Sequence, residues 1–143
     1  MTPQAMADIH AAAFPTSRSW GAEEIASLTE SPLVSVLTHM HGFAIVRTIA
    51  QEAELLTIAV LPQAQRRGVG HSLMQNWLGS TQAHEAFLEV AADNGPAGSL
   101  YMRHGFAEVA RRNAYYKRSD GTSVDAIVMR AALPLQHGTS IPL

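Results

Sequence analysis

The fold of this chain is decided by two adjoining stretches, Glu54-Leu55-Leu56-Thr57-Ile58-Ala59-Val60-Leu61 and Gln65-Arg66-Arg67-Gly68-Val69-Gly70. The first is an almost unbroken apolar run that Pro62 ends, and such a run predicts a central strand buried on both faces. Beyond the second stretch, the apolar residues among 73–78 fall on one helical face, which predicts a helix over about 70–79. A buried strand, a glycine-containing loop and a helix therefore follow one another in the middle of the chain.

Weaker patterns on either side of this unit predict the rest of the fold. Alternating apolar residues indicate strands, apolar residues at helical spacing indicate helices, and glycines mark the turns between them. The resulting fold class is α/β or α+β, with helices packed on a mixed sheet. The predicted helices cover 3–13, 22–29 and a short segment after Asn94 that ends at Gly105, and the predicted strands cover 33–38, 43–49, 86–91, 107–117 and 124–131.

The composition indicates one soluble globular domain, with 143 residues of which 47% are hydrophobic, and 10 Lys and Arg against 12 Asp and Glu. We expect a single domain over 1–133 and a flexible tail over 134–143, where two prolines and a glycine leave nothing to pack in register. Because the chain has no Cys, a disulfide scaffold, a Cys-ligated zinc site and a thiol nucleophile are excluded. The net charge of -2 argues against a general nucleic-acid or anionic-membrane binder.

Targeting and membrane signals are not visible in the sequence. Its start has no cationic segment ahead of the apolar residues, and no apolar run approaches the ~18 residues that span a bilayer. We therefore expect a cytoplasmic protein with no membrane partner. A chain of this length buries enough surface for a core of its own, so we expect a monomer or a weak dimer.

The glycine loop is the first candidate for chemistry. Glycines and free N–H groups at a helix N-terminus suit a pyrophosphate, and Arg66 and Arg67 add positive charge. An ordinary turn that needs small residues would look the same. A Walker loop is excluded because no Gly-Lys-Ser/Thr follows. A dinucleotide fingerprint stays open because Glu89 lies about twenty residues after Gly68, although Leu73 stands where the third glycine belongs.

Two further residues are candidates for acid and base chemistry. Glu89 is an acid in a strand that otherwise looks buried, and a carboxylate in such surroundings suits a general base. An acid on an edge strand would instead face water, and the residues alone favour neither interpretation. Tyr101 lies about one turn into the following helix, where its phenol could donate a proton, although a tyrosine at such a position is more often part of the core.

These features occur in the order seen in a known family. Gln65-x-x-Gly68-x-Gly70 after a strand resembles the acyl-CoA pyrophosphate loop of the GNAT acetyltransferase superfamily. The resemblance covers about residues 55–132 and implies a GNAT-like mixed, mostly antiparallel central sheet flanked by about four helices. Later motifs resemble the ribosomal-protein-alanine N-acetyltransferase, or RimI-like, branch: Leu88-Glu89-Val90 with Asn94, Leu100-Tyr101-x-x-x-Gly105-Phe106, Arg111-Arg112-Asn113-x-Tyr115-Tyr116, Asp120-Gly121 and Asp125-Ala126-Ile127-x-Met129.

The resemblance implies a role for each matching residue. Glu89 would be the general base and Tyr101 the general acid of a direct transfer from acetyl-CoA to an amine. A backbone N–H near Val60 or Leu61 would meet the oxyanion, and no metal is required. Main-chain groups of Ile58, Ala59 and Val60 would line acetyl-CoA, the pyrophosphate would be held by Arg66, Arg67, Gly68, Val69, Gly70 and His71, and Asn94 would contact the pantetheine or its phosphates.

The resemblance further implies that the acceptor is the N-terminal α-amine of a protein, a ribosomal small-subunit protein in that branch. Two alternatives stay open: an acetyltransferase for a small amine, and a module that binds acyl-CoA or a dinucleotide as a regulatory ligand without turnover. The chain departs from the family pattern at Ala91 and Asp93, where Arg and Ser are common, and Asp93 is expected to favour a cationic acceptor. Residues 1–4 leave little room for the family's first strand, so that strand is expected to be absent or rebuilt.

Overall fold

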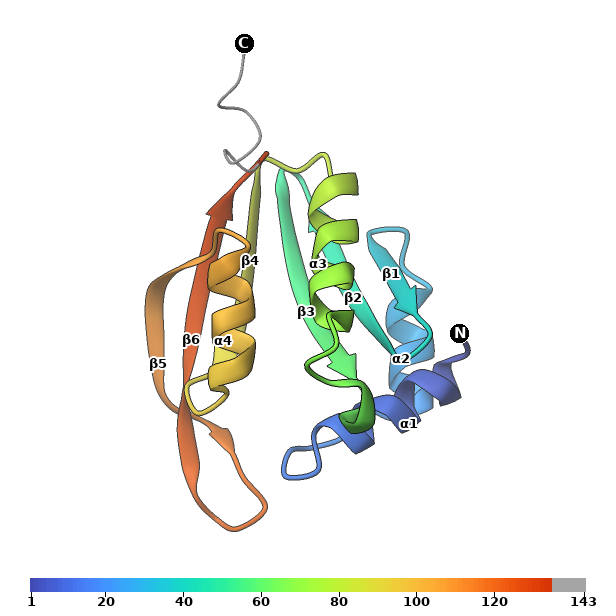
Figure 1. Cartoon of the computed structure of the whole chain (residues 1–143), viewed down its shortest axis with the longest axis vertical. Helices are drawn as coiled ribbons and strands as arrows, with labels where there is room; N and C mark the ends of the chain where they lie inside the picture. Colours follow the sequence, from blue (N-terminus) through green and yellow to red (C-terminus); the bar gives the residue numbers. More distant parts are fainter. Residues whose placement is uncertain (135–143) are drawn as a thin grey trace.

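The computed structural model describes residues 1–134, so all but the first residue of the predicted tail over 134–143 lies outside the described residues. Each predicted helix and strand is present, with ends shifted by one or two residues. None of the helices in this part of the chain is long and apolar enough to cross a membrane. The elements, drawn in Figure 1, are α1 (Pro3–Ala13), α2 (Ala22–Thr29), β1 (Val34–His39), β2 (Gly42–Ile49), β3 (Glu52–Val60), the short 3-10 turn η1 (Pro62–Ala64), α3 (Val69–Ser80), β4 (Glu85–Ala91), α4 (Gly95–Arg103), β5 (Ala107–Lys117) and β6 (Ser123–Ala132).

The six strands form one sheet in the order β1-β2-β3-β4-β6-β5. β3 and β4 run parallel because α3 carries the chain back along the sheet between them, and every other neighbouring pair is antiparallel. The prediction of a mixed, mostly antiparallel sheet with four helices is confirmed. Within the described residues no strand precedes α1, as expected, and β1 therefore forms one edge of the sheet.

Alternation along β2 shows which helices cover which face of the sheet. Ala44 and Val46 are buried in one cluster with the apolar side chains of α3 and α4. Phe43 and Ile45 are buried in another cluster with those of α1 and α2. Because successive residues of a strand point to opposite faces, α3 and α4 cover one face, as Figure 1 shows, and α1 and α2 cover the other.

The central strand β3 differs from its prediction. Only Ala53, Leu55 and Ala59 of its nine residues are buried, so the expectation of burial on both faces is wrong. The reason is that β4 pairs with β3 only over residues 52–54. Beyond that point the two strands separate (Figure 1), and the side chains there border a cleft instead of a packed core.

A β-bulge in β3 also changes which face each of its side chains meets. The register with β2 shifts between Ile45 and Val46, which leaves Leu56 as an extra residue without a partner. An extra residue shifts the alternation by one position. Leu55 accordingly belongs to the cluster under α3 and α4, whereas Ala59, four residues later, belongs to the cluster under α1 and α2.

An arginine holds the closed end of the separating strands together. Arg130 of β6 pairs with Glu52 of β3 at 3.2 Å and also with Glu85 of β4, and its guanidinium lies 4.8 Å from the centre of the Phe87 ring. A planar guanidinium can contact two carboxylates and an aromatic face at once. The strands are therefore joined at one end and free to diverge at the other.

Candidate functional site

The separation of β3 and β4 opens a cleft of about 1410 Å³. One part, which we call the loop arm, is bordered by the glycine loop and the start of α3, residues 65–66 and 68–71. The other part, which we call the hairpin arm, is bordered by α1 with the loop that follows it, residues 10–20, and by the end of β5, residues 115–118. β3, β4 and α4 line the region between the two arms.

The loop arm presents backbone donors that the helix does not use. α3 begins after Gly68, whose φ of 84° is left-handed, and no side chain caps this helix end. The N–H of Ser72 donates to the Gly68 carbonyl at 2.9 Å, so the N–H groups of 69–71 have no partner within the helix. Together with the positive end of the helix dipole, these groups suit an anionic ligand. Arg66 lines the same arm and adds a positive charge.

Small residues let the start of α3 lie close to its neighbours. A Cβ atom on Gly42 would lie 2.7 Å from the carbonyl oxygen of Ala59 and 3.3 Å from Cγ1 of Val69. A Cβ atom on Gly70 would lie 3.1 Å from the side chain of Leu100. Glycine at these two positions therefore allows β2, α3 and α4 to approach one another around the loop arm.

Two histidines join α3 to α4 behind the loop arm. Nδ1 of His71 lies 3.0 Å from Nε2 of His104, which is buried at the C-terminal end of α4. One ring nitrogen of this contact must carry the proton and the other must accept it. The contact therefore ties the first turn of α3 to the last turn of α4.

The structure gathers most of the predicted site residues along the cleft. Asn94 lies at the start of α4, where its side-chain oxygen accepts from the Ala97 N–H at 3.3 Å. Two predicted residues do not line the cleft: Arg67, and Ala59, which is buried in the cluster under α1 and α2. The lining residues are Ile58, Val60, Arg66, Gly68, Val69, Gly70, His71, Glu89, Asn94 and Tyr101.

Backbone pairing distinguishes the two predicted oxyanion donors. The N–H of Leu61 donates to the carbonyl of His41 at 2.9 Å, so it is already used. Val60 faces Gly42 in the next position of the same antiparallel ladder. Hydrogen-bonded and non-hydrogen-bonded pairs alternate along such a ladder, so Val60 and Gly42 form a non-hydrogen-bonded pair. The N–H of Val60 therefore points away from β2, toward the side of β3 from which β4 has separated.

Glu89 lies on β4 with a half-buried side chain in the cleft. Nε of Arg112 lies 3.0 Å from its Oε2, and the Glu89 side chain is 26% exposed. Among the described residues no partner with hydrogen-bond geometry reaches this oxygen. β4 is an interior strand between β3 and β6, but at Glu89 it pairs only with β6, so this residue lies where the β3 side of the strand is open to the cleft.

Two tyrosines line the cleft together with Glu89. Tyr101 is buried on α4, and burial, with a smaller effect of Tyr116, raises the pKa of its phenol above the usual range. Burial also raises the pKa of Tyr116, and the negative charge of Glu89 adds to that effect. A phenol with a raised pKa stays protonated at neutral pH. The cleft therefore brings a carboxylate, which can accept a proton, near phenols, which can donate one.

An irregular segment of β5 brings Tyr116 and Tyr115 to the hairpin arm. Between Arg112 and Tyr116 the register with β6 shifts, and Ala114 has a φ of 50°. The N–H of Ala114 donates to Oδ1 of Asp125 at 2.9 Å, which holds this bulge in place. A bulge bends its strand and redirects the side chains beside it.

The opposite wall of the hairpin arm is aromatic. The His10 ring lies 4.7 Å from the Phe14 ring and stacks on the Trp20 ring at 5.3 Å. Nδ1 of His10 accepts from the backbone N–H of Trp20 at 3.4 Å. Burial, followed by the positive charge of Arg18, lowers the pKa of His10 to about 4. The imidazole is therefore neutral at physiological pH.

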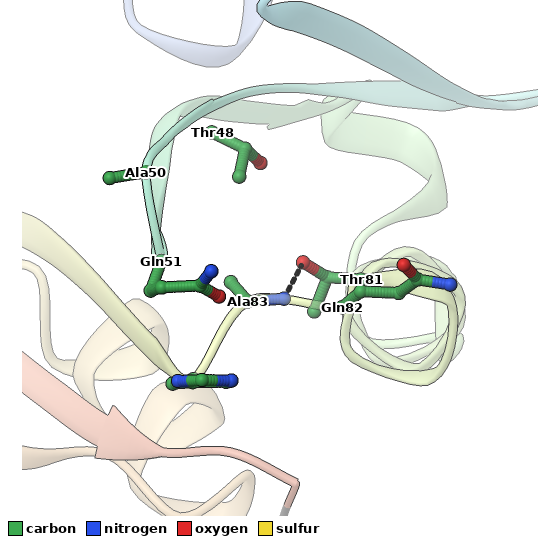
Figure 2. Close-up of a pocket in the computed structure, with 7 residues that line it drawn as sticks. Thr48, Ala50, Gln51, Thr81, Gln82 and Ala83 are labelled. Atoms are coloured by element: carbon green, nitrogen blue, oxygen red, sulfur yellow. Dashed lines mark hydrogen bonds between the residues drawn. The ribbon is translucent and has the colours of Figure 1, made fainter.

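A second hollow lies between the turn that joins β2 to β3 and the loop that joins α3 to β4 (Figure 2). Its lining has no Asp, Glu, Lys or Arg, and a hydrogen bond from the Ala83 N–H to Oγ1 of Thr81, 3.3 Å long, lies within the loop that joins α3 to β4. It offers no group for acid and base chemistry beyond His84. Within residues 1–134 no three His, Asp or Glu side chains gather as metal ligands. The cleft is therefore the candidate functional site.

His10, Ser17 and Arg118 are among the residues that line the cleft but were not predicted as site residues. His10 carried a local signal, because it is a polar residue on the core-facing side of an apolar helix. Ser17 and Arg118 carried none, because their hydrogen bond joins positions 101 residues apart.

Comparisons with known sequences point to one family. A family model described as an acetyltransferase (GNAT) domain matches residues 19–108. The ribosomal protein bS18-alanine N-acetyltransferase of Escherichia coli K12 is 39% identical over 99 residues, which cover 67% of this chain and 65% of that protein. The N-alpha-acetyltransferase RimI of Mycobacterium tuberculosis is 39% identical over 84 residues, which cover 59% of this chain and 51% of that protein. The match thus spans less than two thirds of the length of these curated relatives.

A comparison with solved structures agrees with the sequence matches. The crystal structure of the ribosomal-protein-S18-alanine N-acetyltransferase from Escherichia coli superposes with a TM-score of 0.81 at 30% sequence identity. The superposition covers 99% of this chain and 92% of that one. The similarity in structure therefore includes both arms of the cleft.

Proposed function

This chain belongs to the GNAT acetyltransferase family, and on that basis we propose that it transfers an acetyl group from acetyl-CoA to the N-terminal α-amine of a protein. One observation carries the proposal: a single cleft holds free helix N–H groups in one arm and Glu89 and Tyr101 where the arms meet. A relative is named for acetylating an alanine of a ribosomal protein. A ribosomal protein that begins with alanine is accordingly the acceptor that we propose first.

In this proposal the loop arm holds acetyl-CoA. The N–H groups of 69–71 and the guanidinium of Arg66 meet the pyrophosphate, where the helix dipole and the side-chain charge both favour an anion. Asn94, across the arm, contacts the pantetheine. The lining of the cleft gives no support to side-chain contacts from Ala59 and Arg67, and their roles stay predictions.

The chemistry needs one base and one acid. An amine is protonated at neutral pH and cannot attack a thioester until a base removes its proton. Glu89 accepts that proton, directly or through a water, and the amine nitrogen then forms a bond to the thioester carbon. The N–H of Val60 stabilises the charge that develops on the thioester oxygen. As the carbon–sulfur bond breaks, the phenol of Tyr101 donates its proton to the sulfur, and the second proton that the nitrogen must lose returns to the phenolate through water.

The acceptor enters through the hairpin arm in this proposal. That arm has aromatic walls from Trp20 and Phe14 on one side and from Tyr115 and Tyr116 on the other. Aromatic walls suit a peptide backbone and short apolar side chains. Glu89 lines the same cleft, and its charge acts on Tyr116 of this arm, so in this proposal the amine at the end of the acceptor chain meets it there.

A panel of acceptors tests the proposal by mass spectrometry. The panel contains peptides with different free N-termini, including alanine, a peptide with a blocked N-terminus and an internal lysine, and small amines such as spermidine. We expect acetylation of free peptide α-amines in the presence of acetyl-CoA, with alanine preferred.

Each other result assigns a different function. Acetylation of the small amines alone would keep the transfer chemistry and refute the protein acceptor. Binding of acetyl-CoA without acetylation of any amine would favour a regulatory binding module. Binding of NADH with no binding of acetyl-CoA would refute the acetyl-CoA site itself.

A further inference from the structure

Arg118 joins three segments of the chain at the mouth of the hairpin arm. Its Nη2 lies 2.7 Å from Oδ1 of Asp93, in the loop between β4 and α4. Its Nη1 donates to Oγ of Ser17, in the loop between α1 and α2, at 3.3 Å. The Arg118 side chain is only 14% exposed, and its guanidinium lies 5.8 Å from the centre of the Tyr116 ring. All of these residues line the cleft.

Backbone contacts reinforce this connection. The N–H of Ser119 donates to the carbonyl of Thr16 at 3.3 Å, so the turn between β5 and β6 touches the loop between α1 and α2 directly. The turn itself is closed by the Arg118 N–H, which donates to the Thr122 carbonyl at 2.8 Å, and Gly121 has a φ of 90°. The guanidinium thus extends from an ordered turn to two separate loops.

The pairing also changes the interpretation of Asp93. From the sequence, this acid is expected to favour a cationic acceptor. Its carboxylate is instead paired with Arg118 at 2.7 Å, and a carboxylate already neutralised by a guanidinium attracts an ammonium group weakly. The acid is therefore better understood as a partner of Arg118 than as a receptor for the acceptor.

We infer that Arg118 is a positioning residue that sets the shape of the acceptor opening by holding the α1–α2 loop and the β4–α4 loop against the β5–β6 turn. The inference rests on the proposed function, because the hairpin arm receives the acceptor only if acetyl-CoA fills the loop arm. The planar fork of a guanidinium reaches Asp93 and Ser17 at once, which the single ammonium of a lysine does not do. The guanidinium of Arg118 also lies against the Tyr116 ring and holds it beside Glu89. The acceptor therefore meets a wall of the cleft that is already in place.

Steady-state kinetics with a peptide that begins with alanine test this role. For Arg118→Met we expect the KM for the peptide to rise about tenfold, which is the scale of one charged hydrogen bond. The KM for acetyl-CoA and the kcat at saturating substrates stay within about twofold of wild type. Arg118→Lys gives an intermediate peptide KM because it keeps the charge and loses the fork.

A double-mutant cycle separates the pair from general loosening of the fold. If Arg118 acts through Asp93, Asp93→Asn raises the peptide KM as well, and Arg118→Met with Asp93→Asn is no worse than Arg118→Met alone. Arg47→Met is the matched control, because Arg47 also pairs with one carboxylate, Glu54, at 2.8 Å and lies outside the cleft. Its peptide KM should equal that of wild type.

Hydrogen exchange provides a readout that does not depend on turnover. Loss of the Arg118 contacts should speed exchange of the Ser119 amide, which donates to Thr16, while amides in the sheet core keep their protection. An unchanged peptide KM in an active Arg118→Met enzyme would overturn the inference, as would equal rises in both KM values. A wild-type protein that acetylates no amine would refute the proposed function, and the acceptor role with it.

Discussion

Replacing Glu89 by glutamine tests the centre of the proposed mechanism. The substitution keeps the size and shape of the side chain and removes its ability to accept a proton at neutral pH. General base catalysis typically contributes 10²–10⁴ in rate, so we expect kcat to fall by about 10²–10⁴-fold, or roughly 3–5 kcal/mol of transition-state stabilisation. The KM for acetyl-CoA should change little, because its pyrophosphate is expected to lie in the loop arm, away from β4.

The structure also predicts a small effect of this substitution on stability. The ion pair that Glu89 forms with Arg112 is lost, but the Arg112 side chain is 56% exposed. An exposed pair of this kind contributes less than about 1 kcal/mol. For a domain of this size that corresponds to a fall in Tm of at most about 4 °C. A large loss of kcat with a nearly unchanged Tm is therefore the expected result.

Glu54→Gln is the matched control for this experiment. The Glu54 side chain is also 26% exposed, lies on the neighbouring strand β3 and pairs with Arg47 at 2.8 Å, but it does not line the cleft. We expect kcat to be unchanged in this variant. The assay is release of CoA with the best acceptor from the peptide panel, at saturating concentrations of both substrates, with thermal unfolding recorded for each variant.

Two results would refute the assignment of Glu89 as the base. The first is a Glu89→Gln enzyme whose kcat is within about threefold of wild type, since a lost base must cost far more than that. The second is an equal fall in kcat for Glu54→Gln, because the effect would then come from loss of a carboxylate on the sheet rather than from its place in the cleft.

Three further predictions concern other parts of the cleft and its support. Tyr101→Phe should lower kcat by about 10²-fold or more. Because burial raises the pKa of the Tyr101 phenol, the kcat of the wild-type enzyme should show no loss from ionisation of this phenol up to about pH 10. Burial lowers the pKa of His10 from 6.5 to about 4, so between these pH values the unfolded chain binds a proton that the native state does not. The contribution of His10 to the unfolding free energy is therefore complete above pH 6.5 and falls by roughly 1–3 kcal/mol toward pH 4. The difference in unfolding free energy between wild type and His10→Phe, measured in urea across that pH range, tests this. Gly42→Ala should lower the unfolding free energy by about 1–3 kcal/mol, because the new Cβ would lie 2.7 Å from the Ala59 carbonyl oxygen. Gly98→Ala should instead raise it by roughly 0.5–1 kcal/mol, because its Cβ would meet nothing within 4 Å. Equal effects of the two glycine variants in urea unfolding would contradict these two expectations.

Local patterns in the sequence determined the elements and their order. The apolar alternation of 43–49 and the helical spacing of 73–78 are properties of neighbouring residues, so the strand and helix they indicate appear where expected. Asn94 caps α4 through a contact three residues away, and Gly105 ends it with a φ of 93°. Signals of this range can be read from the chain because both partners lie within one turn of each other.

The candidate site was predictable only in part. The glycine loop and the apolar strand before it indicated an anion-binding helix start, and the motifs around Glu89 and Tyr101 indicated an acid and a base. The residues themselves left open whether Glu89 faced water on an edge strand, because a strand's neighbours depend on the order of the whole sheet. The sheet order places β4 between β3 and β6, but its pairing with β3 ends before Glu89, so this residue lies at the open cleft between the two strands.

Features that join distant segments were decided by the tertiary structure alone. The apolar run of β3 predicted burial on both faces, and this prediction was wrong. Hydrophobicity does not reveal that the pairing of β3 with β4 ends at residue 54 or that Leu56 forms a β-bulge. The contacts of Arg118 span 25 residues to Asp93 and 101 residues to Ser17. Local sequence encodes how a segment folds, whereas the partner of a side chain depends on where the rest of the chain packs, and the shape of the cleft is set by such partners.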